Sequence, residues 1–317
     1  MIELKNKLIL APMAGVAESV LRILAKKMGA DIVWSEMISA DGLCRGHKNT
    51  FNYLEHSEIE NPFIIQIFGS EAEIVAQAAQ IVSQKKPFAI DINMGCPVRK
   101  VVKRNAGSGM MKDPDNIRQC IKDVRKSITV PLSVKFRLGI NEQQINYLTI
   151  GKIAEQEGCD FVTLHPRTQV QVYTGNADWN AIQKLKNEIK IPVIGSGDIT
   201  SATSAKKMQT ETGCDALMIG RHFLKDPFIF YHIKKALYNT TPDIAFTNLR
   251  ELVTYHAQEI ITKYGEYKGS GMFRKHLAQY SKGLTGSNEF RRKINSLRQQ
   301  DELLKEIDEF FPADNIE

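Results

Sequence analysis

The chain has 317 residues, of which 43% are hydrophobic, and a formal net charge of +6 at pH 7. This length suits one large α/β barrel or two modest domains. The sequence has no apolar run of about 18 residues and no signal-peptide pattern, so we expect no membrane association. Its five cysteines are widely spaced and form no CxxC pair, which argues against disulfides and zinc and favours a cytoplasmic protein without a metal.

Eight short apolar, β-rich runs alternate with helical patterns in the first part of the chain. They cover residues 8–14, 31–37, 63–69, 88–95, 132–139, 161–168, 192–199 and 216–223. Between them, apolar residues recur three and four positions apart, and capping residues such as Ser70 and Asp113 precede the first turn. Eight such repeats are typical of a (β/α)8 TIM barrel, whereas a doubly wound sheet usually has fewer. We therefore predict a barrel over residues 1–240.

After about residue 240 the strand pattern stops and three or four helical segments follow. We predict a small all-α domain over residues 241–317. Residues 268–298 contain eight Lys or Arg and a single acid, Glu289. This asymmetry favours a face that binds a polyanion, although a solvated helix surface is the alternative.

Each predicted strand ends in residues that can bind or react. In chain order these are Pro12 with Met13, Glu36, Gln66, Asn93 with Cys96, Lys135 with Arg137, His165 with Arg167, the Ser196-Gly197-Asp198 turn, and Gly220 with Arg221. The C-terminal ends of barrel strands meet at one face, where barrel enzymes build their active sites. We therefore expect a catalytic site at this face.

Two strand ends indicate a phosphate site, because small residues at 196–198 and 220 let backbone N–H groups approach an anion. Arg221 could add a bidentate contact. Lys135 and Gln66 would suit the pyrimidine edge of a flavin such as FMN, where a cation stabilises the reduced ring. A sugar phosphate is the alternative ligand, with Glu36 as the base of an isomerase. His165 stands apart from other metal-ligating residues, so we expect no metal site.

Cys96 lies in a Gly-Cys-Pro turn at a strand end and is followed by Arg99, Lys100, Lys103 and Arg104. A thiol opposite a hydride donor could protonate one carbon of an activated C=C bond while hydride reaches the other. The neighbouring cations would instead favour a thiolate if they faced the sulfur, and the sequence leaves this open. The alternative for a free cysteine is a small buried hydrophobe, which we expect for Cys120, Cys159 and Cys214.

The strand-end motifs follow a recognisable order. They read APMAG, SEM, QIFGSE, DINMGCPVRKVVKRNAGSG, VKFRLG, HPRT, GSGDI and IGR. In order and spacing this series resembles the tRNA-dihydrouridine synthases, and FRKHLAQYSKGLTGSNEFRRKI resembles their helical tRNA-binding domain. The resemblance covers roughly residues 8–298 and is strongest to the bacterial type. The chain differs in having Ser196 where many members have Asn, and in reading H-P-R-T where a glycine often follows the histidine.

The resemblance implies an oxidoreductase that uses bound FMN and transient NADPH to reduce the C5=C6 bond of uridines in tRNA. Pro12, Met13, Ala14, Gln66, Lys135 and His165 would then contact the isoalloxazine. The FMN phosphate would bind Ser196, Gly197, Asp198, Gly220 and Arg221. Asn93, Arg137 and Arg167 would face the uracil. Cys96 would donate a proton to C5 while flavin N5 delivers hydride to C6.

The tRNA backbone would meet basic residues in two places. We expect contacts from Arg99 and Lys100 in the barrel loop, and from the tail residues Arg274, Lys275, Lys282, Arg291, Arg292 and Lys293. We expect a monomer that extrudes the target uridine from the folded tRNA. Two alternatives remain: an FMN barrel acting on a small molecule, as in dihydroorotate dehydrogenases, and an RNA-binding protein without chemistry.

Overall fold

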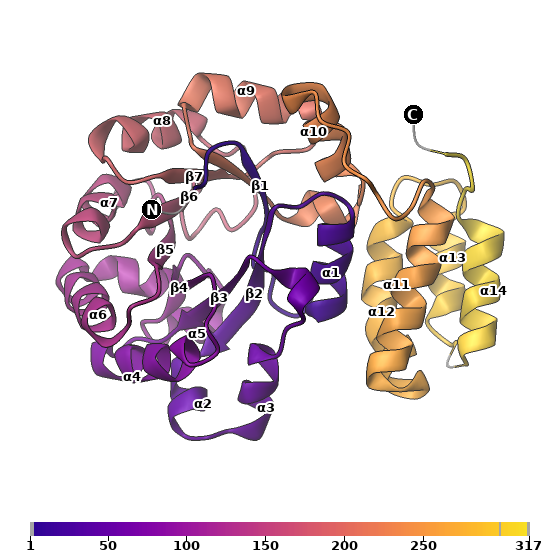
Figure 1. Ribbon diagram of the computed structural model, residues 1–317, viewed down its shortest axis with the longest axis horizontal. Coiled ribbons are helices and arrows are strands. Elements are labelled where there is room, and N and C mark those ends of the chain that lie inside the picture. The colour runs from indigo at the N-terminus through magenta and orange to yellow at the C-terminus, as the bar shows by residue number, and fades with distance from the viewer. Residues whose placement is uncertain (1–2, 298, 316–317) are drawn as a thin grey trace. The chain divides into compact units, whose positions relative to one another are not determined.

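The computed structural model describes residues 3–297 and 299–315 and divides into two compact units (Figure 1). The first unit contains the chain up to Ser19 together with Ala30–Gly220. The second contains Val20–Gly29 together with the chain from Arg221 onward. The second unit therefore begins at Arg221, before the predicted boundary at residue 240. The helices that directly follow the last strand belong to this unit and not to the barrel.

Eight parallel strands pair in chain order and close into a barrel, which confirms the predicted fold (Figure 1). The strands are β1 (Lys7–Leu10), β2 (Ile32–Ser39), β3 (Phe63–Phe68), β4 (Ala89–Met94), β5 (Leu132–Arg137), β6 (Phe161–His165), β7 (Val193–Ser196) and β8 (Ala216–Ile219). Every one of them lies inside a predicted β-rich run or overlaps it. β8 pairs with β1 from Lys7↔Ala216 onward and completes the circle.

Helices connect successive strands along the chain. They are α1 (Ser19–Lys27), α2 (Ala40–Cys44), α3 (Lys48–Phe51), α4 (Ala72–Ser83), α5 (Arg99–Val102), α6 (Pro114–Ser127), α7 (Tyr147–Gln156), α8 (Trp179–Glu188) and α9 (Ala202–Thr212). The predicted cap Asp113 accepts a hydrogen bond from the Asn116 N–H at 3.1 Å. The prediction that Ser70 caps α4 is wrong, because the helix begins one residue later than expected. Its N-cap is Glu71, whose side chain makes no capping hydrogen bond.

Side chains inside the barrel change from apolar to polar along the strands. Trp34 and Phe161 lie in the apolar core cluster, with ring centroids 6.3 Å apart. Further along the strands, the register places polar residues opposite one another, as in Gln66↔Asp91 and Lys135↔Thr163. Because strand side chains alternate between faces, these polar residues point the same way as the apolar ones. The polar layer therefore lies inside the barrel toward the C-terminal ends of its strands.

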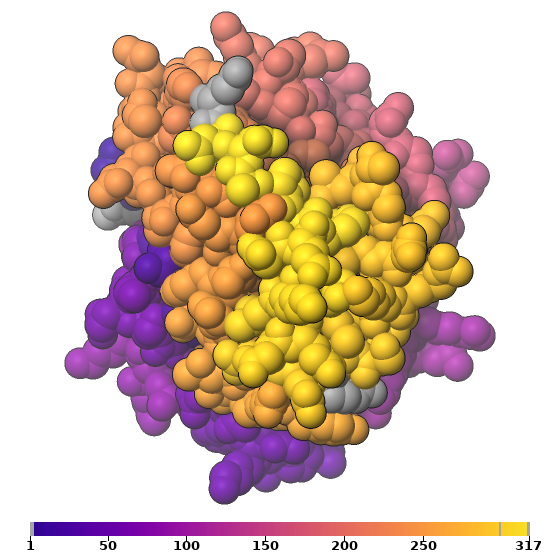
Figure 2. Space-filling model, turned by 90° about the vertical axis from the view of Figure 1, so that its right-hand side faces the viewer, coloured from indigo at the N-terminus to yellow at the C-terminus, as the bar shows by residue number. Residues whose placement is uncertain are grey.

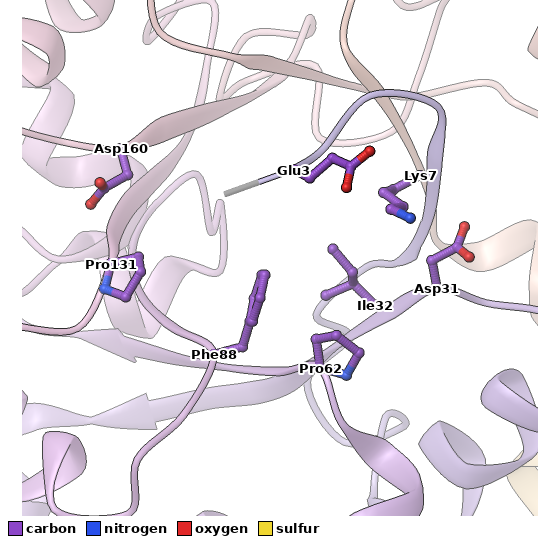
Figure 3. Close-up of a pocket in the computed structure, with 8 residues that line it drawn as sticks. All are labelled: Glu3, Lys7, Asp31, Ile32, Pro62, Phe88, Pro131 and Asp160. Carbon is purple, nitrogen blue, oxygen red and sulfur yellow. The ribbon is translucent and has the colours of Figure 1, made fainter. Parts of the chain in front are cut away.

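A cavity of about 520 Å³ lies at the opposite end, where the strands begin (Figure 3). Its lining combines apolar residues such as Phe88 with the carboxylates of Asp31 and Asp160. Asp31 accepts the backbone N–H of Leu8 and Asp160 that of Leu132, each at 2.8 Å. These carboxylates satisfy backbone donors at strand starts, so their role at this end is structural.

The second unit is helical. Besides α1 from Val20 onward, it contains η4 (Arg221–Leu224), α10 (Ile229–Tyr238), α11 (Leu249–Tyr264), α12 (Glu266–Tyr280), α13 (Ser287–Ile294) and α14 (Gln300–Phe310). The C-terminal helices, yellow in Figure 2, lie against the orange helices that precede them. Phe290 of α13 stacks on Phe310 of α14 with centroids 3.9 Å apart. Within the described residues, no helix has the length and apolar character needed to cross a membrane.

Candidate active site at the C-terminal ends of the barrel strands

Two neighbouring strands, β3 and β4, bring Gln66, Asp91 and Asn93 together inside the barrel. The Gln66 Nε2 donates to Asp91 Oδ2 at 2.7 Å, and the Asn93 Nδ2 donates to Gln66 Oε1 at 2.8 Å. Ser133 on β5 donates through its hydroxyl to Asp91 Oδ1 at 2.6 Å. The prediction that strand-end residues meet at one face holds for Gln66 and Asn93.

The loop after β4 holds Cys96 by its backbone on both sides. Asn93 Oδ1 accepts the N–H groups of Gly95 and Cys96 at 3.1 and 2.9 Å. The Cys96 carbonyl accepts from the Ser108 N–H at 3.0 Å and from the Ser108 hydroxyl at 2.8 Å. Gly107 adopts φ +56°, and a Cβ there would lie 2.9 Å from the Cys96 carbonyl oxygen, so a side chain does not fit. The backbone that carries the Cys96 thiol is therefore closely held.

The Cys96 side chain is partly buried. Burial raises the pKa of the thiol above its ordinary value, and the Val98 N–H and the charges of Arg137 and Lys135 lower it to a smaller extent. The flanking Arg99 and Lys100 are exposed at the start of α5. Burial therefore outweighs the nearby cations and favours the protonated thiol, the form that a general acid requires.

Lys135 and Asp91 carry opposite charges inside the barrel. Burial, followed by repulsion from Arg137, lowers the pKa of Lys135 to about 8, and attraction to Asp91 and Cys96 opposes this shift. Burial raises the pKa of Asp91 to about 6, against hydrogen bonds from Ser133 and Gln66 and the charge of Lys135. Buried groups with such shifts are typical of functional sites.

Arg137 and Arg167 are buried, and their guanidinium groups bind loop backbone. Arg137 donates to the carbonyls of Gly95 at 2.7 Å, Thr168 at 3.0 Å and Val172 at 2.8 Å. Arg167 donates to the carbonyls of Thr174 at 3.1 Å and Gly175 at 2.6 Å, and to Asp198 at 2.8 Å. The implied uracil contacts stay predictions, but both arginines shape the loop after β6.

The predicted phosphate residues lie at the ends of β7 and β8. Asp198 has φ +58°, and its carboxylate accepts from Arg167 and from the Ala177 N–H, so the side chain binds the β6 loop. At Gly197 a Cβ would lie 3.1 Å from the His165 ring, and at Gly220 it would lie 3.4 Å from Ala11 Cβ. Packing therefore also favours glycine at Gly197, whereas a Cβ at Gly220 would make an ordinary contact.

The remaining predicted contacts lie in the loop after β1 and at the start of η4. Pro12 and Met13 are partly buried and Ala14 is exposed, while Arg221, the first residue of η4, is exposed. Glu36 is 7% exposed, and one of its carboxylate oxygens accepts the Gly15 N–H. This bond anchors the β1 loop and favours a structural role for Glu36 over that of an isomerase base.

The sequence matches the model of the Dihydrouridine synthase (Dus) family over residues 9–315. The chain belongs to this family. It is 37% identical to tRNA-dihydrouridine synthase B of Vibrio vulnificus (strain CMCP6), across 99% of this chain and 98% of that protein. It is 36% identical to tRNA-dihydrouridine synthase B of Pasteurella multocida (strain Pm70), across 98% of this chain and 94% of that protein.

Solved structures of other proteins share the barrel. Histamine dehydrogenase from Rhizobium sp. 4-9 matches with a TM-score of 0.55 at 12% identity, over 80% of this chain and 49% of that chain. 2-Naphthoyl-CoA reductase matches with a TM-score of 0.56 at 14% identity, over 74% of this chain and 50% of that chain. At these identities the likeness concerns the fold alone.

The predicted tail contacts of this dihydrouridine synthase lie on the helical unit. Lys282, Arg292 and Lys293 are exposed, and Arg274, Lys275 and Arg291 are partly exposed. Several already have partners: Arg274 donates to the Leu297 carbonyl at 2.6 Å, Arg291 to Asn288, and Lys293 pairs with Glu306. Arg298, which contributes to the basic excess in the sequence, lies outside the described residues.

Sequence reasoning missed three residues of the site. Asp91 and Ser133 belong to the interior network, and the Arg137 guanidinium lies 5.6 Å from the ring centroid of Tyr173, which also stacks near His165. Strand alternation could have found the first two, because each lies two residues before a predicted site residue on the same strand. Tyr173 lies in an irregular loop, where no periodic signal exists.

Proposed function

We propose that this chain is a tRNA-dihydrouridine synthase that reduces the C5=C6 bond of uridines in tRNA, with FMN as bound cofactor and NADPH as reductant. The observation that supports this most is Cys96, whose backbone is held at the end of β4 and whose thiol pKa is raised by burial despite the charges of Arg137 and Lys135. Family membership and the names of the relatives agree with it.

The described residues fit a flavin with a phosphate tail. The pKa of Lys135 is lowered because the neighbouring negative charges only partly offset the cost of burying its ammonium group. An anionic flavin edge would add a further negative charge beside it. The Thr163 hydroxyl, next to Lys135 in the register, is buried and has no hydrogen-bond partner among the described residues. When bound, FMN would supply hydride to uracil C6.

The proposed cofactor contacts follow the strand ends. The ring would lie against Pro12, Met13, Ala14, Gln66, Lys135 and His165. The phosphate would bind the backbone at Ser196, Gly197, Asp198 and Gly220 and the side chain of Arg221. The contribution of Asp198 is assigned to its backbone, because its carboxylate binds Arg167 and would repel a phosphate.

The protein's own chemistry is a proton transfer. The Cys96 Sγ–H would give its proton to C5 of a uracil held by Asn93, Arg137 and Arg167. The thiolate that remains would be stabilised by the charges of Lys135 and Arg137, which already lower the pKa of this thiol, and would recover a proton from water. Hydride and proton together complete the addition of two hydrogens across the double bond.

The tRNA would bind through its phosphates to Arg99 and Lys100 and to the tail residues Arg274, Lys275, Lys282, Arg291, Arg292 and Lys293. Such contacts offset the cost of extruding a base, which is a few kcal/mol. We assign the activity to the cytoplasm, where tRNA and NADPH are available.

The test is an anaerobic half-reaction. The purified protein, reconstituted with FMN, is reduced with NADPH, and tRNA lacking dihydrouridine is then added. The proposal predicts that flavin absorbance is bleached by NADPH and restored by tRNA while dihydrouridine appears. Bleaching without restoration would favour a small-molecule substrate, and failure to bind FMN would contradict the proposed chemistry.

A further inference from the structure

A continuous chain of hydrogen bonds joins the barrel interior to the backbone of Cys96. It runs from Asp91 through the Gln66 and Asn93 side chains to the N–H groups of Gly95 and Cys96, with donor–acceptor distances of 2.7, 2.8, 3.1 and 2.9 Å. Gln66 and Asp91 are completely buried and Asn93 is 8% exposed. Water therefore has little access to replace a link that breaks.

The links traced from the Cys96 end show which orientation of each amide the loop needs. A backbone N–H can only donate, so the oxygen of the Asn93 amide must face Gly95 and Cys96. The Asn93 amide nitrogen then faces Gln66 and needs an acceptor, which fixes the Gln66 oxygen on that side. The Gln66 nitrogen is left to donate to residue 91, and only an acceptor at 91 completes the chain.

An ionised carboxylate is the one side chain of this shape that can only accept. Asp91 Oδ2 takes the Gln66 donor and Oδ1 takes the Ser133 hydroxyl at 2.6 Å. Burial of the carboxylate has a cost, which its raised pKa of about 6 reflects. An asparagine would avoid that cost, but it could turn either its NH2 or its oxygen toward Gln66.

We propose that Asp91 is a positioning residue: as an obligatory acceptor it sets the orientation of the Gln66 and Asn93 amides and so holds the Cys96 loop in place. Its relevance to uridine reduction rests on the proposed function, in which Cys96 donates the proton. Asp91 acts through Gln66 and Asn93 and touches neither partner of the reaction.

The test measures the reactivity of the Cys96 thiol in Asp91→Asn, with iodoacetamide as probe and peptide mass spectrometry as readout. When the amide nitrogen of the introduced asparagine faces Gln66, Gln66 and Asn93 rotate, and Asn93 presents a donor to the two N–H groups. The loop then loosens and Cys96 loses burial, so its pKa falls toward the ordinary value. We expect about three- to tenfold faster alkylation at pH 7.5 and a pH profile shifted downward.

Electrostatics alone would give the opposite sign. The Asp91 charge raises the pKa of Lys135, and the Lys135 charge lowers that of Cys96. Loss of the Asp91 charge would therefore leave Lys135 less protonated and alkylation of Cys96 slower. Unchanged or slower alkylation in Asp91→Asn overturns the proposal.

Two controls lie in the same chain. Cys44 is exposed outside the network, and its alkylation rate within each sample should not change. Ser133→Ala removes a buried bond to Asp91 but leaves the direction of the chain intact, so the Cys96 rate should stay within about twofold of wild type. A Ser133→Ala effect as large as that of Asp91→Asn would overturn the proposal in favour of a general loss of packing.

A double variant should restore the direction of the hydrogen bonds between residue 91 and Cys96. In Asp91→Asn combined with Gln66→Glu, the new carboxylate at position 66 accepts from the introduced asparagine and from Asn93, so the Asn93 oxygen again faces Cys96. Alkylation within about twofold of wild type supports the proposal, and a rate like that of Asp91→Asn overturns it. If Asp91→Asn fails to fold, the double variant alone decides in the same way, and failure of both to fold also overturns it.

The two proposals can fail separately. Alkylation of Cys96 requires neither flavin nor tRNA, so it reports on Asp91 even if no dihydrouridine forms. Conversely, normal dihydrouridine synthesis with unchanged alkylation in Asp91→Asn would preserve the proposed function and remove the role of Asp91.

Discussion

The two units of the molecule differ in where their functionally proposed charged residues lie. The barrel buries Asp91, Arg137 and Arg167 and partly buries Lys135. The pKa of Asp91 is shifted to about 6 and that of Lys135 to about 8. The helical unit instead carries cations such as Arg292 on its surface. Enclosed charges interact strongly with each other and with the thiol, whereas surface charges are screened by salt.

This contrast predicts that the barrel interior controls the chemistry at Cys96 and that the helical unit controls tRNA binding. Changes in the barrel interior around Lys135 and the Cys96 loop backbone should alter chemistry at Cys96 and leave tRNA affinity nearly constant. Changes on the helical unit should alter tRNA affinity and its salt dependence and leave the chemistry of the bound complex intact. Variants of each unit test this division, and they are given in order of decreasing expected effect.

The largest effect is expected from Gly107→Ala. The added Cβ would lie 2.9 Å from the Cys96 carbonyl oxygen and 3.0 Å from Cys96 Cβ, so the loop must shift. A displacement near 1 Å costs about 100-fold in rate when a catalytic group is misplaced. We expect that loss in single-turnover formation of dihydrouridine, with NADPH reduction of the flavin unchanged.

Gly213→Ala is the matched control. Gly213 also has positive φ, +65°, but nothing lies within 4 Å of a Cβ there. Both variants should lose about 1 kcal/mol of stability from backbone strain, and only Gly107→Ala should lose activity. Equal activity of the two would show that the Cys96 loop tolerates displacement.

A smaller effect is expected when the cations of α13 are neutralised together, as Arg291→Gln, Arg292→Gln and Lys293→Gln. Removing one phosphate-binding cation reduces the slope of log Kd against log salt by about 1. We expect about tenfold weaker tRNA binding at low salt and a shallower slope. Arg292 should contribute most, because Arg291 already binds Asn288 and Lys293 pairs with Glu306.

A control triple, with Lys184, Lys190 and Lys206 changed to Gln, removes the same charge from exposed positions of the barrel unit. Its slope should equal that of wild type. If both triples change the slope equally, tRNA responds to net charge and not to α13.

The smallest effect is expected for Lys135→Met, measured on the thiol. Lys135 lowers the pKa of Cys96, so its removal should raise that pKa and slow alkylation about two- to fivefold. Because the pKa of Lys135 is about 8, its charge is present below pH 8 and disappears above it. The difference from wild type should therefore be greatest below pH 8.

Lys100→Met, which removes an exposed cation from the same loop as Cys96, serves as the comparison. We expect its Cys96 profile to coincide with that of wild type. A shift as large as that of Lys135→Met would mean that surface cations control the thiol, contrary to the effect of burial.

Much of the barrel was predictable because its signals are local. Each strand is a short apolar run, and Asp113 caps α6 as its position before a proline-initiated helix suggests. The meeting of Gln66 and Asn93 also followed from the barrel geometry, since strand ends converge.

The roles of the arginines were not predictable in the same way. Arg137 binds the carbonyls of Thr168 and Val172, about thirty residues further along the chain, in a loop with irregular backbone. Asp198 likewise binds Arg167 across strands. Such contacts depend on the path of a loop, which no periodic pattern encodes. For the same reason the sequence did not indicate that Val20–Gly29 joins the second unit.

The most direct test of the account compares wild type with Cys96→Ala, and with Cys44→Ala as control, in the anaerobic half-reaction. All three proteins should be reduced by NADPH at equal rates. On addition of tRNA lacking dihydrouridine, we predict that wild type and Cys44→Ala form dihydrouridine normally and that Cys96→Ala is at least about 100-fold slower, the contribution of a general acid. Formation of dihydrouridine by Cys96→Ala at the wild-type rate would contradict the account.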